Sequence, residues 1–127
     1  MREILFRAKT KATKEWTYGH YAKQYDVPQM YAGNGYECIY EDTLCQYTGL
    51  TDKNGTKIFE GDVVRISEDY YDGLHYSGNE VYYSDGAFCV EYETPEYDVT
   101  SIGFLVKEGV EVIGNIYDNP ELLSERE

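Results

Sequence analysis

The sequence predicts an all-β (mainly β) fold, a small SH3-like barrel elaborated with β-hairpins and a short C-terminal helix. Two observations support this prediction. The chain has fifteen tyrosines, a residue type that favours strands, and residues 46–66 (QYTGLTDKNGTKIFEGDVVRI) combine a hairpin, a tight corner and a buried strand. With 127 residues, 42% of them hydrophobic, the chain can bury a normal core, so we expect one domain over residues 1–127.

The N-terminal part predicts a strand and a return strand. Residues 2–9 place Ile4, Phe6 and Ala8 on one face, which is the alternation of a half-buried strand. After a polar turn, residues 15–18 are expected to run back along this strand.

The next stretch predicts less regular structure. Trp16 is expected to pack in the core or at an edge rather than to serve as a ligand platform. Pro28 is expected to end any regular element between residues 19 and 35. Residues 36–40 and 43–47 have the composition of short strands that lead into the central hairpin.

The central hairpin is predicted from Asn-Gly, which tolerates the positive φ angles of a two-residue turn. A two-residue turn at residues 54–55 places Asp52 opposite Lys57 and Leu50 opposite Phe59, and both pairings are favourable. The corner Glu60-Gly61-Asp62 and a buried strand at residues 63–66 follow. The Asp62 carboxylate is expected to accept N–H groups of that corner.

A second hairpin is predicted after an acidic, tyrosine-rich loop at residues 67–79. A two-residue turn at Asp85-Gly86 places Tyr83 opposite Phe88 and Val81 opposite Val90. The same register places Glu80 opposite Glu91, and such like-charge pairs are unfavourable.

The C-terminal part predicts a strand and a helix. Residues 110–117 alternate as a strand, with Gly114 at a bulge or a close backbone contact. Asn119-Pro120 is typical of a helix start, and Leu122 with Leu123 is expected to fix that helix to the barrel.

The charge of the chain limits the ligands that we expect. With 24 acidic and 11 basic side chains the net charge is −13, which weighs against direct binding of nucleic acid through its phosphates. The three cysteines are odd in number and have no CxxC spacing, and the first residues are not a signal peptide. No stretch has enough apolar residues to cross a bilayer. We therefore expect a cytoplasmic protein with reduced cysteines and no membrane partner.

The sequence offers little support for catalysis or metal binding. His20, His75, Cys38, Cys45 and Cys89 have spacings that fit no zinc site. No nucleophile elbow, zinc-protease, P-loop or calcium-loop motif is present, and a glycine pair at residues 33 and 35 lacks the rest of a dinucleotide fingerprint. We expect no catalytic residues, no metal and no cofactor.

Three stretches resemble a known family. They are QYTGLTDKNGTKIFEGDVV at residues 46–64, MREILFRAKTK at residues 1–11 and VEVIGNIYDNPELL at residues 110–123. Together they resemble the YopX family, uncharacterised proteins encoded by phages and prophages of bacteria. The resemblance implies a phage or prophage origin, hence a bacterial host cell, and a small, mostly β fold. It implies no catalytic or binding residues.

The composition favours a non-enzymatic protein-binding or self-assembling module that contacts a host or phage protein or its own copies. Tyrosine beside carboxylate suits protein recognition, because the ring anchors at low entropic cost and the charge steers a basic partner. The predicted surface consists of Glu68, Asp69, Tyr70, Tyr71, Asp72, Tyr76, Glu91, Tyr92, Glu93, Glu96 and Tyr97. One alternative is an acidic DNA mimic that inhibits a host nucleic-acid-binding protein, and a second is an enzyme of unknown class, which would need a concave pocket.

Overall fold

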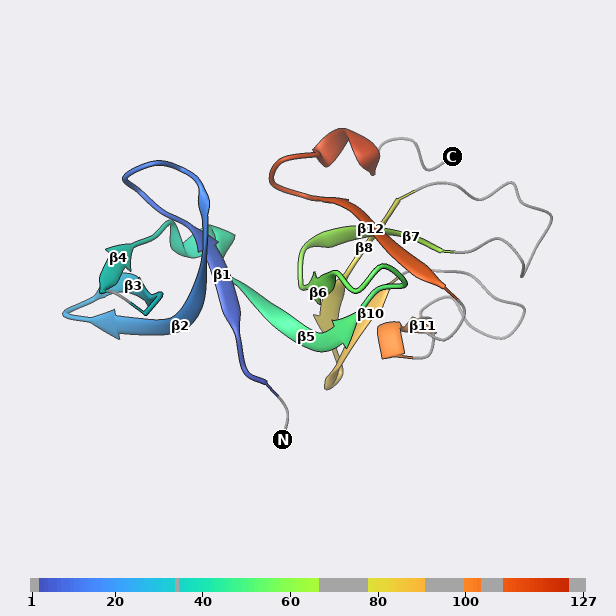
Figure 1. Ribbon diagram of the computed structural model, residues 1–127, viewed down its shortest axis with the longest axis horizontal. Coiled ribbons are helices and arrows are strands. Elements are labelled where there is room, and N and C mark those ends of the chain that lie inside the picture. Colours follow the sequence, from blue (N-terminus) through green and yellow to red (C-terminus); the bar gives the residue numbers. More distant parts are fainter. Residues whose placement is uncertain (1–2, 34, 67–77, 91–99, 104–108, 124–127) are drawn as a thin grey trace. The chain divides into compact units, whose positions relative to one another are not determined.

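The structure, a computed structural model, describes residues 3–33, 35–66, 78–90, 100–103 and 109–123 (Figure 1). It is mainly β, as predicted. The chain divides into two compact units, Met1–Gly49 and Leu50–Glu127, and the expectation of a single domain stays a prediction. In the part of the chain that the structure describes, no helix is long and apolar enough to cross a membrane.

The first unit contains an antiparallel sheet in which the strand order is β4-β3-β2-β1-β5. Its strands are β1 (Phe6–Lys9), β2 (Trp16–Gln24), β3 (Val27–Tyr31), β4 (Tyr36–Cys38) and β5 (Cys45–Thr51). A 3₁₀ turn, η1 (Glu41–Thr43), precedes β5. An isolated bridge between Thr10 and Ile39 also pairs the chain after β4 with the end of β1.

The long strand β2 changes partner along its length. Its first half pairs with β1 as far as Gly19, and its second half pairs with β3 from His20 onward. The strand curves visibly (Figure 1), and a Cβ atom added at Gly19 would lie 2.0 Å from the carbonyl oxygen of Tyr31. Glycine is required here because the backbone of β3 occupies the space that a side chain needs.

The expectation that Pro28 ends regular structure is wrong. Tyr25 and Asp26, with φ angles of 51° and 63°, make a two-residue turn, and Pro28 lies in the return strand β3. Pro28 pairs with Lys23, one position beyond the pair that flanks the turn. Pairs alternate between hydrogen-bonded and non-hydrogen-bonded in antiparallel strands, so the pairing with β2 demands no N–H from proline. On its other side the carbonyl of Pro28 accepts the N–H of Ile39 (3.2 Å), a bond in which proline is only the acceptor.

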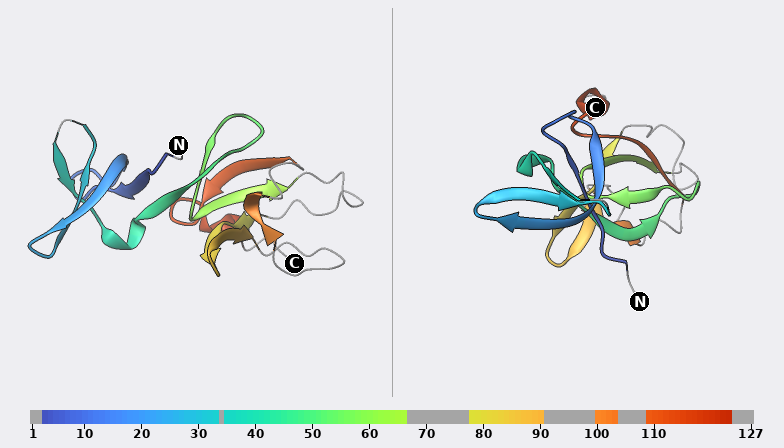
Figure 2. Two further views of the ribbon diagram at one scale, coloured as in Figure 1. Left: turned by 90° about the horizontal axis from the view of Figure 1, so that it is seen from below. Right: turned by 60° about the vertical axis from the view of Figure 1, so that its left-hand side comes forward.

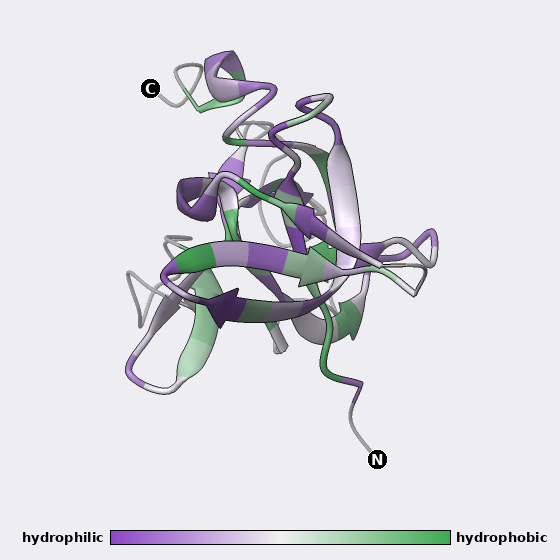
Figure 3. Cartoon of the chain, turned by 90° about the vertical axis from the view of Figure 1, so that its left-hand side faces the viewer, coloured by the Kyte–Doolittle hydropathy of each residue, from purple (hydrophilic) through white to green (hydrophobic). Residues whose placement is uncertain are grey.

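The core of the first unit lies on one face of the curved sheet. Of the predicted face, Ala8 is fully buried, whereas Ile4 is 54% exposed and precedes β1. Hydrophobic and hydrophilic residues alternate along the strands of this unit (Figure 3). The core consists of Ala8, Met30 and Ile39, with Phe6, Tyr21 and Leu44 packed against them.

The second unit contains two three-stranded sheets, with strand orders β12-β7-β8 and β11-β10-β9 (Figure 2). Its strand β6 is hydrogen-bonded to β5. The strands are β6 (Lys57–Phe59), β7 (Asp62–Ile66), β8 (Asn79–Glu80), β9 (Tyr82–Ser84), β10 (Ala87–Val90), β11 (Thr100–Ser101) and β12 (Val110–Asn115). The core consists of Ile58, Val64, Val81, Val90, Ile102 and Val110. The described strands form no closed barrel, and the SH3-like assignment stays a prediction.

The central hairpin forms, but its turn is one residue longer than predicted. The N–H of Asp52 donates to the carbonyl of Thr56 (2.8 Å), and the N–H of Gly55 donates to the carbonyl of Asp52 (3.0 Å). Among residues 53–55 only Gly55 has positive φ, so the loop is a turn followed by a glycine bulge. Asp52 therefore lies opposite Thr56 instead of Lys57, and the predicted Leu50–Phe59 pairing shifts with it.

Other local predictions are confirmed. Asp85 and Gly86 both have positive φ, and Tyr83 pairs with Phe88, whose ring meets it edge-on at 5.2 Å between centroids. The pairing of β12 with β7 shifts register between Val112 and Gly114, where a bulge was expected. Glu91 lies outside the described residues, so its pairing with Glu80 is untested.

Among the described residues at the C-terminal end, up to Leu123, the chain forms a 3₁₀ turn, η3 (Pro120–Leu122), where a short helix was expected. Proline takes the first position as predicted, but Asn119 makes no side-chain cap to the turn. Its Oδ1 instead accepts the N–H of Asn115 at the end of β12 (3.3 Å). A longer C-terminal helix is not confirmed by the described residues.

Candidate binding surface

The eleven residues of the predicted acidic surface all lie outside the described residues, in segments 67–77 and 91–99. The structure therefore leaves that surface untested. His75 also lies in the first of these segments. Across the residues that are described, no three His, Cys, Asp or Glu side chains gather where they could hold a metal ion.

One face of the first sheet is rich in exposed aromatic side chains. Cross-strand partners share a face, and the register pairs Arg7 with Tyr18, Lys9 with Trp16, His20 with Tyr31 and Tyr31 with Tyr36. We call the side of β1–β4 that carries these residues, opposite the core, the outer face. Its members are Arg7, Lys9, Trp16, Tyr18, His20, Ala22, Gln24, Val27, Gln29, Tyr31, Tyr36 and Cys38.

The outer face combines exposure with aromatic contacts. Tyr18 is 48% exposed, Tyr31 is 39% exposed and Tyr36 is 55% exposed. The rings of Tyr31 and Tyr36 lie 5.1 Å apart between centroids. Tyrosine and tryptophan are enriched at protein interfaces because they bury a large area with few rotatable bonds. The outer face thus has the composition of an interface.

Charge separates this face from the rest of the chain. Residues 1–49 carry six acidic and six basic side chains, whereas residues 50–127 carry eighteen acidic and five basic ones. None of the outer-face residues defined above is Asp or Glu. The face is therefore aromatic and basic in a chain whose net charge is −13.

Three cationic side chains of the first unit lie over aromatic rings. Arg7 Cζ is 4.5 Å and Lys9 Nζ is 5.3 Å from the centroid of the Trp16 ring, and Lys11 Nζ is 5.8 Å from that of Tyr40. These distances are typical of cation–π contacts. We call these five residues the cation–aromatic cluster.

Tyr21, Lys23 and Glu41 form a polar group on the core side of the first sheet. The hydroxyl of Tyr21 donates to the carboxylate of Glu41, and Lys23 Nζ lies 3.5 Å from the same carboxylate. The hydrogen bond raises the pKa of Tyr21 and lowers the pKa of Glu41. Because these shifts favour the protonated phenol and the ionised acid, the group fastens η1 to β2 rather than exchanging protons at neutral pH.

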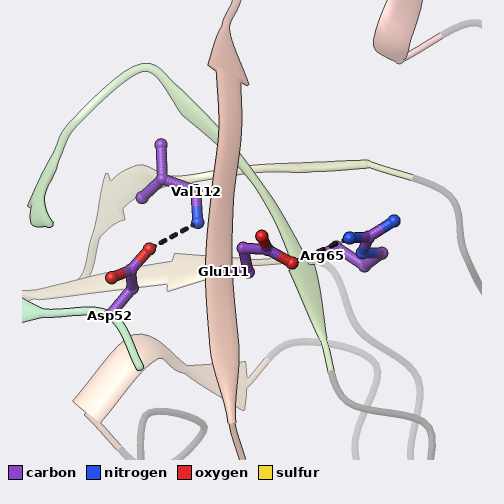
Figure 4. A network of polar contacts seen from close by, with 4 residues as sticks. All are labelled: Asp52, Arg65, Glu111 and Val112. Atoms are coloured by element: carbon purple, nitrogen blue, oxygen red, sulfur yellow. Dashed lines mark hydrogen bonds and ion pairs between the residues drawn. The ribbon is translucent and has the colours of Figure 1, made fainter. Parts of the chain in front are cut away.

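The second unit holds a buried carboxylate, Asp52, whose oxygens accept three backbone N–H groups; Figure 4 shows the one from Val112. Oδ1 accepts from Asn54 (2.8 Å) and Thr56 (2.9 Å), and Oδ2 accepts from Val112 in β12 (2.9 Å). Burial by itself would raise the pKa of Asp52, but these N–H groups and the nearby Lys53 lower it. A carboxylate held ionised in this way anchors the hairpin to β12 and makes a poor general acid.

Two further acids of the second unit, Asp62 and Glu111, also serve structure. Asp62 is buried and its Oδ2 accepts the N–H of Phe59 (2.8 Å), which confirms its predicted place in the corner. Arg65 and Glu111 are cross-strand partners in β7 and β12 and form an ion pair at 2.7 Å (Figure 4). The hydrogen bond from Arg65 lowers the pKa of Glu111.

Sequence reasoning missed the outer face because it treated residues 19–35 as irregular. The face contains Tyr31 and Tyr36, and only the pairing of β3 with β2 and β4 brings them beside His20 and Cys38. A usable signal was present in the basic segment RAKTKATK, residues 7–14, which precedes Trp16 in an otherwise acidic chain.

Comparisons with known proteins identify relatives over most of the chain. Residues 5–124 match the family model described as YopX protein. The SPbeta prophage-derived uncharacterized protein YopX of Bacillus subtilis (strain 168) is 33% identical over 97 residues, which cover 67% of this chain and 71% of that protein.

Two solved structures share the fold over nearly their whole length. Protein EF1440 from Enterococcus faecalis superposes with a TM-score of 0.59 at 27% identity, and protein yopX from Bacillus subtilis with a TM-score of 0.65 at 23% identity. Each match covers 97% of this chain and 99% of the other. The family match confirms the resemblance that the three sequence stretches predicted, and this chain belongs to the YopX family.

Proposed function

We propose that this protein is a non-enzymatic binding protein that contacts a partner protein, or further copies of itself, through the outer face of its first unit. The observation that supports the proposal is the exposure of Tyr18, Tyr31 and Tyr36 on a face without acidic residues. A sheet face that contacts only solvent rarely carries several half-exposed aromatic rings, whereas a protein interface gains most of its affinity from such residues.

Two tyrosines provide a matched pair of variants that tests the proposal. Tyr36 in the first unit is 55% exposed and contacts Tyr31, while Tyr83 in the second unit is 56% exposed and contacts Phe88. Tyr36→Ala is expected to weaken partner binding or self-association by about tenfold or more, because central aromatic anchors contribute about 2 kcal/mol. Tyr83→Ala removes the same area elsewhere and is expected to leave binding unchanged.

The measurement combines affinity capture from a nuclease-treated bacterial lysate with analytical ultracentrifugation of the purified protein. Supporting the proposal requires a stoichiometric partner, or a defined oligomer, that is lost with Tyr36→Ala and kept with Tyr83→Ala. The proposal fails if neither variant changes what is bound, or if both variants change it equally.

A second candidate function, mimicry of DNA, is favoured by the distribution of charge. Eighteen of the 24 acidic residues belong to residues 50–127, so one unit carries the whole net charge of −13. A dense negative charge can compete with DNA for a basic protein. This candidate predicts that the protein displaces DNA from a basic host protein at low salt and releases it at high salt. Absence of competition at low salt would exclude it.

A further inference from the structure

The basic residues of the first unit are concentrated in one segment. Residues 7–14 contain Arg7, Lys9, Lys11 and Lys14, which are four of the eleven basic side chains of the chain. Lys11 and Lys14 are exposed, Lys9 is half-buried and Arg7 is buried. The segment covers the end of β1 and the turn that leads into β2.

Pairing places an aromatic ring on each side of this segment. On one side Lys9 pairs with Trp16 in β2. On the other side Thr10 bridges Ile39, and the N–H of Tyr40 donates to the carbonyl of Lys9 (2.9 Å), so Tyr40 lies beside Lys9. Two strand spacings separate the chains of Trp16 and Tyr40, a distance of about 10 Å. A row of cations therefore runs between two rings.

The simplest role of the cation–aromatic cluster is to stabilise the first sheet, because lysine and arginine stems cover apolar rings. That role does not require exposed rings or the absence of carboxylates. Yet Tyr18 is 48% exposed and Tyr40 is 36% exposed. Arg7, Lys9 and Trp16 belong to the outer face, which contains no acidic residue, whereas Tyr40 is followed by Glu41 and Asp42. A nucleotide needs both components, because its base stacks on an exposed ring and its phosphate contacts a cation nearby.

We propose that the cation–aromatic cluster, with the neighbouring Tyr18, binds single-stranded nucleic acid. Bases stack on the exposed rings of Tyr18 and Tyr40 beside Trp16, and phosphates contact the ammonium groups of Lys9 and Lys11. A single strand suits the site because its bases present free faces, whereas a duplex hides them. An acidic polypeptide would use the cations but leave the rings without stacking partners.

The proposal departs from the expectation that the net charge excludes nucleic acid. That expectation averaged two units of different charge, since residues 1–49 have equal numbers of acidic and basic side chains. The net charge of −13 on the whole chain repels phosphates at low salt, and this repulsion is screened at high salt together with the phosphate contacts. We therefore expect micromolar binding at best, with a shallow salt dependence.

The experiment uses Trp16, the single tryptophan of the chain, as a probe inside the proposed site. The full-length protein is titrated with a short single-stranded oligothymidine, a duplex of equal length and polyglutamate at low salt. The proposal expects that the oligothymidine quenches Trp16 fluorescence and that fluorescence anisotropy of a labelled oligothymidine rises in parallel. The duplex and polyglutamate are expected to bind at least tenfold more weakly.

Matched variants locate the site. Lys11→Gln is expected to weaken oligothymidine binding about threefold to tenfold and to lower the salt slope by about 0.7, the value for one phosphate contact on a single strand. Tyr40→Ala is expected to weaken it about tenfold. Lys57→Gln makes the same charge change at an exposed position of β6 and is expected to change neither quantity. Far-UV circular dichroism checks that each variant folds.

Several results would overturn the proposal. These are no quenching and no anisotropy change at high micromolar oligothymidine, tighter binding of polyglutamate than of oligothymidine, or equal loss with Lys11→Gln and Lys57→Gln. The proposed protein binding is tested separately, because Tyr36 and Tyr83 do not belong to the cluster. Loss of partner binding with intact oligothymidine binding, or the reverse, would therefore separate the two proposals.

Discussion

The two units of this protein differ in charge and in the way in which their polar groups are used. The first unit is electrically balanced and displays aromatic rings and cations on the outer face of its sheet. The second unit carries the whole net charge, and two of its acids, Asp52 and Asp62, are buried and accept backbone N–H groups. The net charge of a chain thus describes neither unit well.

The difference also concerns what holds each unit together. The fully buried core of the first unit is small, with Ala8, Met30 and Ile39, and β2 reaches both neighbouring strands only because Gly19 lets it pass close to β3. The second unit has a larger aliphatic core and a carboxylate that ties residues 60 positions apart. The stability of the first unit therefore depends on the close backbone approach at Gly19, and that of the second unit depends on the buried carboxylate of Asp52.

The largest effect is expected for Asp52→Ala. The substitution leaves the N–H groups of Asn54, Thr56 and Val112 without their acceptor, which should lower the free energy of unfolding by about 3 kcal/mol. Hydrogen exchange measured by mass spectrometry should show lost protection at residues 50–66 and 109–123 first. If Trp16 fluorescence shows that the first unit loses as much stability as the second, the two units unfold together, and the difference between them drawn above does not hold.

Gly19→Ala is the corresponding change in the first unit. A Cβ atom 2.0 Å from the carbonyl oxygen of Tyr31 forces the backbone to move, and we expect a loss of about 2 kcal/mol in unfolding free energy. Urea denaturation followed by Trp16 fluorescence measures it. Gly103→Ala is the control, since its added Cβ would meet nothing closer than Leu50 at 3.9 Å. Equal stability of the two variants would show that β2 is not constrained at Gly19.

The pH dependence of the second unit should reflect Asp52. Hydrogen bonds lower its pKa in the folded state, so the stabilisation is complete above the unfolded value, about 3.9, and is lost as pH falls through the lower folded value. We expect Asp52→Asn to be less stable than the parent at pH 7 and to approach it in acid. The stability difference is followed by denaturation from neutral pH downward. A constant difference across that range would contradict the assignment.

Salt should stabilise the second unit and leave the stability of the first unit nearly unchanged. Screening of like charges among residues 50–127 is expected to stabilise that unit by on the order of 1 kcal/mol between about 50 and 500 mM salt. The first unit, with six acids and six bases, should change little. Peptide-resolved hydrogen exchange at the two salt concentrations measures both at once. Equal stabilisation of both units would show that the charge does not act unit by unit.

The smallest effect is expected at Arg65 and Glu111. Their ion pair is partly exposed, at 42% and 28% of the side chains, so a double-mutant cycle with Arg65→Ala and Glu111→Ala should give a coupling of about 0.5 kcal/mol. A coupling near zero at high salt is also expected. A value as large as that of Asp52 would mean that surface pairs, not the buried carboxylate, hold β12 in place.

The sequence alone determined the features that depend on local backbone preferences. Asp85-Gly86 predicted a two-residue turn and Tyr83 opposite Phe88, Gly114 predicted the bulge, and Asp62 predicted the corner, and all are confirmed. Asp85, Gly86 and, at the corner, Gly61 have positive φ angles, which few residue types adopt. At Gly114 an added Cβ atom would lie 2.6 Å from Asn119 Oδ1, so that position needs a glycine because of space. The mainly β fold and the YopX family also followed from the sequence.

Only the tertiary structure decided the features that depend on distant partners. Asn54-Gly55 by itself suits a two-residue turn. In the structure the turn is one residue longer, and the Asp52 carboxylate beside it also accepts the N–H of Val112 in β12. Pro28 is tolerated in a strand because its pair with Lys23 needs no N–H and because towards Ile39 it serves as an acceptor. The cation–aromatic cluster forms because a bridge between Thr10 and Ile39 brings Tyr40 to Lys9. Hydrogen bonds between residues far apart in the chain determine these arrangements. The conformational preferences of neighbouring residues therefore could not predict them.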